Sequence, residues 1–275
     1  MIFGIGYRER SKDGVHQFII QNHISKEEYD THLTRLAEAG KISEMEDVYN
    51  LVKRNKEEYL SFTSQIEKHL DNEQLGLEAN RLLINFLSSL QMFIDYGERH
   101  NKKHFGKEKM KEFQKKTNDF YDNHISYRFM VLLRNYALHY GFPLTNIIER
   151  VSQPTRILAT KEDLLKFKGW KHVKVDIEKM PDLISIDVHV EVTMMFIQHL
   201  YESYIYDIAP IVLKGVEHVN SMIKDNGGHV PILTQYKNTD EFKKGNVSLD
   251  IIEPDTYKAA LQIIKDHPSI NIIIK

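Results

Sequence analysis

The sequence predicts a mainly helical protein with small α/β elements at its two ends. Between residues 25 and 228, apolar residues recur mostly at intervals of three and four, the spacing of amphipathic helices. Near both termini, short apolar runs lie between Gly, Pro and Asn residues, as strands and turns do. We therefore divide the chain into N-terminal strands with a helical hairpin (1–72), a helical core (73–228) and a C-terminal α/β appendage (229–275).

Composition excludes several kinds of protein. A chain of 275 residues can form one large or two moderate domains, and 28% charged residues with a net charge of −2 are typical of a soluble globular protein. The absence of Cys excludes disulfides, thiol nucleophiles and thiolate metal sites. We expect no membrane span, because no window approaches roughly 18 apolar residues, and we expect a cytoplasmic location. The near-neutral charge means that any nucleic-acid contact is local.

In the N-terminal region, the sequence predicts a hairpin of two strands followed by a hairpin of two helices. Residues 1–7 and 15–21 are the two strand candidates. Ser25-Lys-Glu-Glu28 has the spacing of a capping box and begins a helix that we expect to end at Gly40. A second amphipathic helix is expected over 43–70.

Three helices are expected to share the core. Residues 75–97 become apolar nearly all round from Leu82, which predicts a central helix. Residues 125–141 form a bounded helix, with Asp122 and Asn123 available as caps and Gly141 at its end. A long helix is expected over 184–208.

The remaining elements are shorter. We expect a helical turn at 145–151, a capped helix at 160–167, a strand at 170–177, and a further helix opened or kinked by Pro210 and ended by Gly227. In the C-terminal appendage, 230–236, 247–252 and 270–274 read as strands and 254–264 as a helix. The N-terminal strands are candidates to join this appendage.

The helix at 125–141 places Arg134, Asn135 and His139 in an otherwise apolar run. At about 100° per residue, one face is apolar, formed by Phe129, Leu133, Tyr136, Ala137 and Tyr140. The opposite face has Val131 and Leu138 in the middle, Arg134 on one flank, and Asn135 with His139 on the other. Because Arg134 and His139 are about 140° apart on one helix, a two-fold axis through this face brings Arg134 of one chain towards His139 of another.

Arg134-Asn-Tyr-Ala-Leu-His139 resembles the Arg-x4–6-His pattern of the HEPN superfamily, helical domains that often dimerise and include many metal-independent ribonucleases. The order of helices from about residue 75 to 148, roughly a quarter of the chain, is also similar to that family. The resemblance implies an HEPN-like helical bundle with Arg134, Asn135 and His139 as catalytic residues. Two further matches, Arg99 to His104 and Arg10 to His16, lie in polar segments and are interpreted as solvated.

RNA cleavage fits these residue types. The substrate's own 2′-hydroxyl attacks the phosphate, so the protein must move a proton and stabilise the phosphorane. Histidine suits the first task and the arginine fork the second, while Asn135 can hold the imidazole or the phosphate. No metal or cofactor is expected, because phosphate-loop, dinucleotide and zinc-protease motifs are absent from the sequence.

The most basic stretch begins where the helix at 75–97 ends. Lys102, Lys103, His104 and Lys107 are our candidates for RNA binding, as a phosphate-tracking patch beside the catalytic residues. The alternative interpretation is a solubilising connection.

Two hypotheses remain open. The first is a homodimeric, metal-independent endoribonuclease acting on RNA, in a phage-defence or growth-arrest role that the resemblance implies. The second is a non-catalytic helical module that dimerises or binds a protein or nucleotide through the same face. The two differ in whether Arg134 and His139 open onto solvent or are sealed by neighbouring groups, since buried polar groups must be paired.

Overall fold

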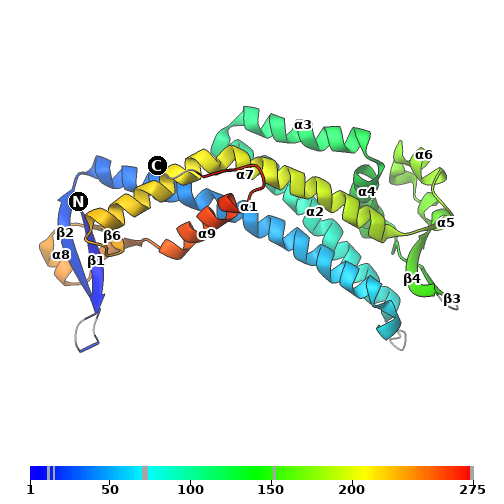
Figure 1. The fold of residues 1–275 in the computed structure, drawn as a ribbon, viewed down its shortest axis with the longest axis horizontal. Helices are drawn as coiled ribbons and strands as arrows, with labels where there is room; N and C mark the ends of the chain where they lie inside the picture. The colour runs from blue at the N-terminus through cyan, green and yellow to red at the C-terminus, as the bar shows by residue number, and fades with distance from the viewer. Residues whose placement is uncertain (11–12, 15, 70–73, 151–152, 273–275) are drawn as a thin grey trace. The chain divides into compact units, whose positions relative to one another are not determined.

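A computed structural model describes residues 1–10, 13–14, 16–69, 74–150 and 153–272. Its long helices are α1 (Lys26–Ser64), α2 (Leu75–Phe105), α3 (Lys107–Asn123), α4 (Ile125–His139) and α7 (Ile186–Asp225) (Figure 1). The mainly helical class predicted from the sequence is therefore confirmed. Within the described ranges, no helix has the length and apolar character needed to cross a membrane.

The chain forms two compact units. Unit 1 contains Met1–Glu44 and Ser203–Lys275, and unit 2 contains Met45–Glu202. The unit boundaries fall inside α1 and α7, so each of these helices contributes residues to both units. This is a division by packing, and the expected three domains, with boundaries near residues 72 and 228, stay a prediction.

Unit 1 is built on an antiparallel sheet with strand order β2-β1-β6-β7. The strands are β1 (Ile2–Arg10), β2 (His16–Ile24), β6 (Pro231–Tyr236) and β7 (Val247–Ile251). The central pair sets Ile5 opposite Leu233, so the N-terminal hairpin does join the C-terminal strands, as the sequence suggested. The register of β1 and β2 shifts after Ile5, at Gly6, where a Cβ atom would lie 1.9 Å from the Ile19 carbonyl oxygen and only glycine fits.

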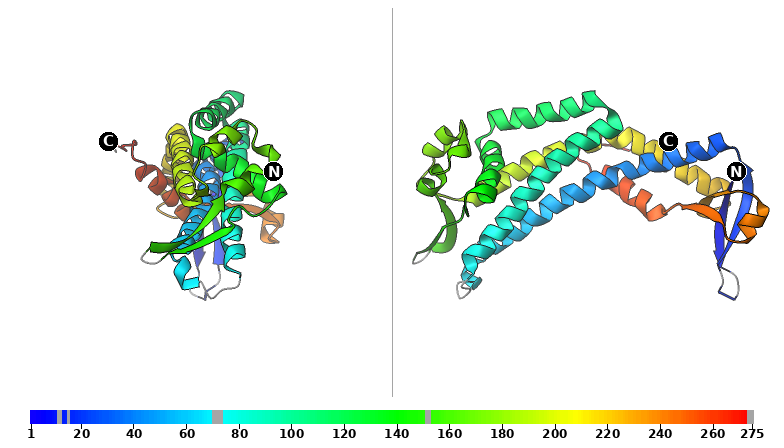
Figure 2. Two further views of the ribbon diagram at one scale, coloured as in Figure 1. Left: turned by 90° about the vertical axis from the view of Figure 1, so that its right-hand side faces the viewer. Right: turned by 180° about the vertical axis from the view of Figure 1, so that it is seen from behind.

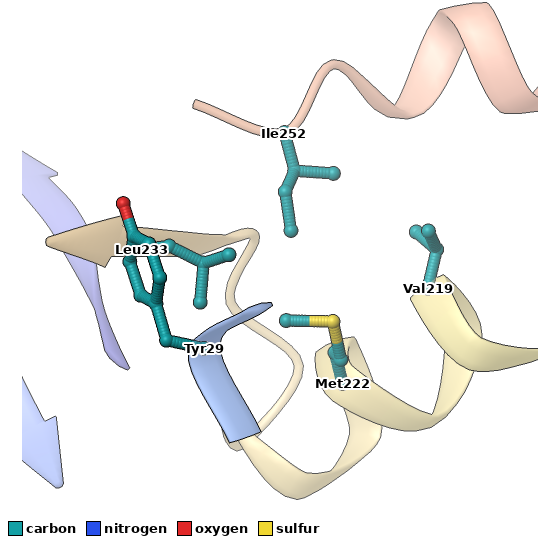
Figure 3. Packing of buried hydrophobic residues seen from close by; sticks show 5 residues of the cluster. All are labelled: Tyr29, Val219, Met222, Leu233 and Ile252. Atoms are coloured by element: carbon teal, nitrogen blue, oxygen red, sulfur yellow. The ribbon is translucent and has the colours of Figure 1, made fainter. Parts of the chain in front are cut away.

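The core of unit 1 joins this sheet to the helices. The buried side chains come from α1, α7, β6 and the residue after β7, and Figure 3 shows them converging: Tyr29, Val219, Met222, Leu233 and Ile252. The Tyr29 hydroxyl donates a hydrogen bond to the Asp250 carboxylate. The unit is completed by α8 (Thr239–Lys243), which the sequence did not predict, and by α9 (Pro254–Lys265), which it did.

Unit 2 contains α2, α3 and α4 with a small sheet. α2 and α3 meet at Gly106, whose φ of 88° favours glycine, and the chain folds back there (Figure 2). The sheet, in the order β3-β4-β5, consists of β3 (Asn146–Arg150), β4 (Gln153–Thr160) and β5 (Leu183–Ile184). The short helices are η1 (Ile66–His69), α5 (Lys161–Leu165), η2 (Lys168–Trp170) and α6 (Val173–Glu178).

The expected break at Gly40 is wrong, because α1 runs as one helix from Lys26 to Ser64. Ala39 and Ile42 on either side of the glycine are fully buried. Their burial offsets the roughly 1 kcal/mol that glycine costs inside a helix. The capping box at the start of α1 is confirmed: the Glu28 N–H donates to the Ser25 hydroxyl at 3.1 Å, and the Ser25 N–H donates to the Glu28 carboxylate at 2.7 Å.

Pro210 does not open a separate helix, since α7 continues through it. Ile208, Ala209 and Val212 are all buried around the proline. Their packing offsets the lost hydrogen bond and the ring clash that a proline introduces into a helix.

The central strands were assigned to the wrong residues. The helical turn expected at 145–151 is instead the strand β3 over Asn146–Arg150, paired with β4, and residue 151 lies outside the described residues. The strand expected at 170–177 is instead η2 and α6. Trp170, Val173 and Ile177 are fully buried at intervals of three and four, so their spacing is helical rather than alternating. The terminal strand is also wrong for residues 270–272, which form no strand, and 273–275 lie outside the described residues.

Candidate functional site

In the structure, α4 begins directly after α3, with only His124 between the two helices. His124 occupies the N-cap position with an extended backbone, and no side chain caps the helix. Asn123, expected as a cap, instead donates its side-chain amide to the Asp119 carbonyl at 2.9 Å. The helix ends at His139, close to the predicted end, and the Gly141 N–H donates to the Tyr136 carbonyl at 3.2 Å.

The buried face of α4 is held by aromatic packing. Phe129, Leu133 and Tyr136 are buried, as predicted from their spacing. Phe129 and Tyr136 both stack on Trp170, with ring centroids 5.7 and 5.8 Å apart. Tyr140, expected on the same face, is instead 51% exposed, because it follows the last helical residue. The packing fixes the rotation of α4 and therefore which side chains lie on its other face.

Arg134 lies on that other face and is half-buried. Its Nε atom is buried and has no hydrogen-bond partner, and no ion pair joins Arg134 to another residue of the described ranges. A buried donor without a partner costs roughly 1–3 kcal/mol, more when the group is charged. The Nε donor of Arg134 therefore has hydrogen-bonding capacity that no group within the described chain uses.

Asn135 is half-buried and His139 is exposed. Within the part of the chain that the structure describes, neither side chain forms a hydrogen bond or ion pair with another residue. An intramolecular pairing of Arg134 or His139 with a carboxylate is therefore not found among these residues. The His139 imidazole is accessible to solvent.

Several residues next to His139 in the sequence have exposed apolar side chains. The segment from the last turn of α4 to β3 contains four of them, each between 43% and 51% exposed: Leu138, Tyr140, Phe142 and Ile147. Contiguous exposed apolar surface marks interaction sites, and these four residues are close together in the sequence. We call this segment, residues 138–147, the α4 exit segment.

The structure anchors the α4 exit segment to α2. The side chain of Asn80, which is 1% exposed, donates to the Leu144 carbonyl at 2.8 Å and accepts from the Leu144 N–H at 3.0 Å. These two bonds satisfy a buried backbone pair that no secondary structure satisfies. They place the end of α4 near the N-terminal part of α2.

The basic stretch lies at the other end of α2. Lys102, Lys103 and Lys107 are exposed, without a carboxylate partner among the described residues, whereas His104 is half-buried with its ring centroid 4.5 Å from that of His100. Part of the following charge is paired within α3, as in the 2.8 Å contact of Lys109 with Glu112. The 17 residues of α3 rise about 25 Å between this stretch and the start of α4. From the sequence, we expected the basic stretch to lie beside Arg134 and His139. The structure does not place it there.

Two titratable contacts on α4 were missed in the sequence. The Arg128 guanidinium donates from Nε to the Asp176 carboxylate at 2.7 Å, and this hydrogen bond lowers the pKa of Asp176. The Ser126 hydroxyl lies 2.9 Å from Nδ1 of His189, whose pKa is lowered by burial. Their partners come from α6 and α7, so no local pattern around α4 reveals them.

Comparison with models of known protein families, with curated proteins and with solved structures finds no match to this chain. The chemistry of α4 is therefore argued from its own residues.

Proposed function

We propose that the protein is a metal-independent endoribonuclease of HEPN type that acts as a homodimer. The observation that supports the proposal best is the free face of α4. Arg134 and His139 lie on this face, held by packing of the opposite face on Trp170, and neither pairs with another described residue. Groups that are held in place and have no partner are suited to bind and process a ligand.

The proposed mechanism uses one group from each chain. His139 of one protomer takes the proton of the RNA 2′-hydroxyl or delivers one to the leaving oxygen, since imidazole titrates near neutral pH. Arg134 of the partner chain stabilises the charge on the phosphorane through two parallel hydrogen bonds. Asn135, one helical turn before His139, orients the imidazole or the phosphate.

The dimer in this proposal forms around the α4 exit segment. Leu138 and Tyr140 flank His139 in sequence and are exposed in the single chain. A two-fold contact buries the same patch on both chains, so these residues lose their exposure to water in the pair. The family resemblance associates such dimers with growth arrest or phage defence, and we propose that setting for this protein.

One observation favours a second function. The exposed lysines at 102, 103 and 107 are separated from Arg134 by the length of α3, so these three residues form no basic track beside the face. A non-catalytic module that dimerises or binds a protein or nucleotide through the α4 exit segment needs no such track. In that case Arg134 pairs with an acceptor of the partner.

An RNA cleavage assay distinguishes the two functions. Wild-type protein is incubated with total RNA in EDTA beside Arg134→Ala and His139→Ala, each of which we expect to reduce cleavage by at least about a hundredfold. Arg99→Ala is the matched control, because Arg99 is exposed and begins the accidental match on α2; its activity stays within a few-fold. Products end in a 2′,3′-cyclic phosphate, and DNA is not cut. A wild-type dimer that cuts no RNA, or activity that persists in His139→Ala, contradicts the proposal.

A further inference from the structure

Two imidazoles from distant parts of the sequence meet inside unit 1. Nδ1 of His32 on α1 lies 2.8 Å from Nε2 of His218 on α7, and the ring centroids are 5.0 Å apart. Both side chains are half-buried. Histidine is the commonest metal ligand among the amino acids, so a pair of facing ring nitrogens is a candidate metal site.

Close packing of the two helices fixes this pair. Gly215 precedes His218 by one helical turn, and a Cβ atom there would lie 2.8 Å from the Arg35 carbonyl oxygen and 2.9 Å from the Ala39 Cβ atom. Arg35 in turn follows His32 by about one turn. The helices therefore approach each other more closely than a side chain at position 215 allows, which holds the two rings in place before any ligand binds.

Both imidazoles have pKa values below the ordinary value for histidine. Burial lowers the pKa of His32, as does its neighbour His218. Burial also lowers the pKa of His218, with a smaller contribution from Arg35. Burial thus favours the neutral form of each ring, which is the form that binds a metal. In the 2.8 Å contact, one ring donates its N–H proton to the other ring. When that ring changes tautomer, the proton moves to its other nitrogen, and both facing nitrogens can then bind a metal.

The spacing is close to that of two ligands of one ion. With metal–nitrogen bonds of 2.0–2.1 Å, two cis nitrogens lie about 2.9–3.4 Å apart, so the rings need to separate and turn only slightly. Glu28 precedes His32 by one turn of α1, and its charge is felt at His32. One of its oxygens accepts from the Ser25 N–H at 2.7 Å. The remaining charged neighbours, Arg35 and Glu38, pair with each other at 2.7 Å.

We propose that His32 and His218 form a binding site for a divalent transition-metal ion, with Zn²⁺ as the probe of choice, that joins α1 to α7 within unit 1. The site has no part in the proposed RNA chemistry, whose residues belong to α4 of unit 2.

Zinc titration of the chelator-treated, full-length protein tests the site. We expect isothermal titration calorimetry to detect an ion whose affinity falls at least about tenfold in His32→Gln and in His218→Gln, because each removes a ligand. Glutamine keeps a polar side chain of similar size, and circular dichroism checks that both variants fold. His199→Gln is the control: His199 is exposed and contacts Phe120 edge-on, and zinc affinity there stays unchanged.

Thermal unfolding supplies a second readout. Because a ligand that binds only the folded state stabilises it, saturating Zn²⁺ raises the Tm of the wild type more than that of the double variant His32→Gln/His218→Gln. Zinc binding and a Tm rise that are the same in wild type and double variant overturn the proposal. The contact is then a hydrogen bond between neutral imidazoles only.

Discussion

Replacing Leu138 by Asp tests the proposed dimer face directly. Leu138 is 44% exposed and lies one turn beyond Arg134 on α4. Full burial of a leucine side chain contributes about 1.5–3 kcal/mol, so burying its exposed 44% contributes roughly 0.7–1.3 kcal/mol per chain. A two-fold interface contains the residue twice, which gives roughly 1.3–2.6 kcal/mol, or about a tenfold to eightyfold weaker dimer. Two carboxylates placed in the interface weaken it further, because each loses water without gaining a partner.

Analytical ultracentrifugation over micromolar concentrations measures this change. We expect a dimer for the wild type and a monomer for Leu138→Asp, with unchanged helical content. Met195→Asp is the matched control, because Met195 is an apolar residue on α7 that is 68% exposed. The reasoning is refuted if Leu138→Asp associates as tightly as the wild type, or if the wild type is itself monomeric.

Three substitutions test the packing that positions α4. Asn80→Ala leaves the buried N–H and carbonyl of Leu144 without partners and lowers the free energy of unfolding by about 2 kcal/mol or more, which urea unfolding measures. Asp176→Asn removes the charge that faces Arg128 and costs about 1.5–3 kcal/mol at pH 7. Because the folded-state pKa of Asp176 is depressed, this contribution is present above the unfolded pKa of about 3.9 and disappears as pH falls through the folded pKa; a difference from wild type that is as large at pH 3 as at pH 7 contradicts the assignment. Phe129→Ala opens a cavity beneath α4 and lowers stability by about 3–5 kcal/mol in the same assay, whereas a loss below 1 kcal/mol contradicts the packing.

The sequence predicts elements whose signals are local. The capping box at Ser25 and Glu28 forms because both partners are three residues apart, and the start of α1 follows from it. The buried face of α4 follows from the spacing of Phe129, Leu133 and Tyr136 alone.

The errors arise where tertiary packing outweighs local preference. Gly40 and Pro210 are helix breakers by propensity, yet each lies between buried apolar residues that keep the helix continuous. Likewise, the segment from Trp170 to Ile177 has β-branched residues, but its burial pattern is helical.

The candidate site was only partly predictable for the same reason. The face that contains Arg134 and His139 is a property of one helix, and the sequence is sufficient to define it. The distance from that face to Lys102 depends on the path of α3, and the contact of His32 with His218 joins residues 186 positions apart. Neither this distance nor this contact can be predicted from the spacing of residues within one element.

The central claim is that each active site takes Arg134 from one chain and His139 from the other, and a mixed dimer tests it most directly. Arg134→Ala and His139→Ala chains are co-expressed with different tags, and RNA cleavage is measured for the mixture and for each variant alone. In a mixed dimer one site lacks both groups and the other keeps both, so random pairing restores about a quarter of the wild-type activity. If Arg134 and His139 of the same chain act together, no site is complete. A mixture no more active than either variant alone, with mixed dimers shown to form and the wild type active, contradicts the account.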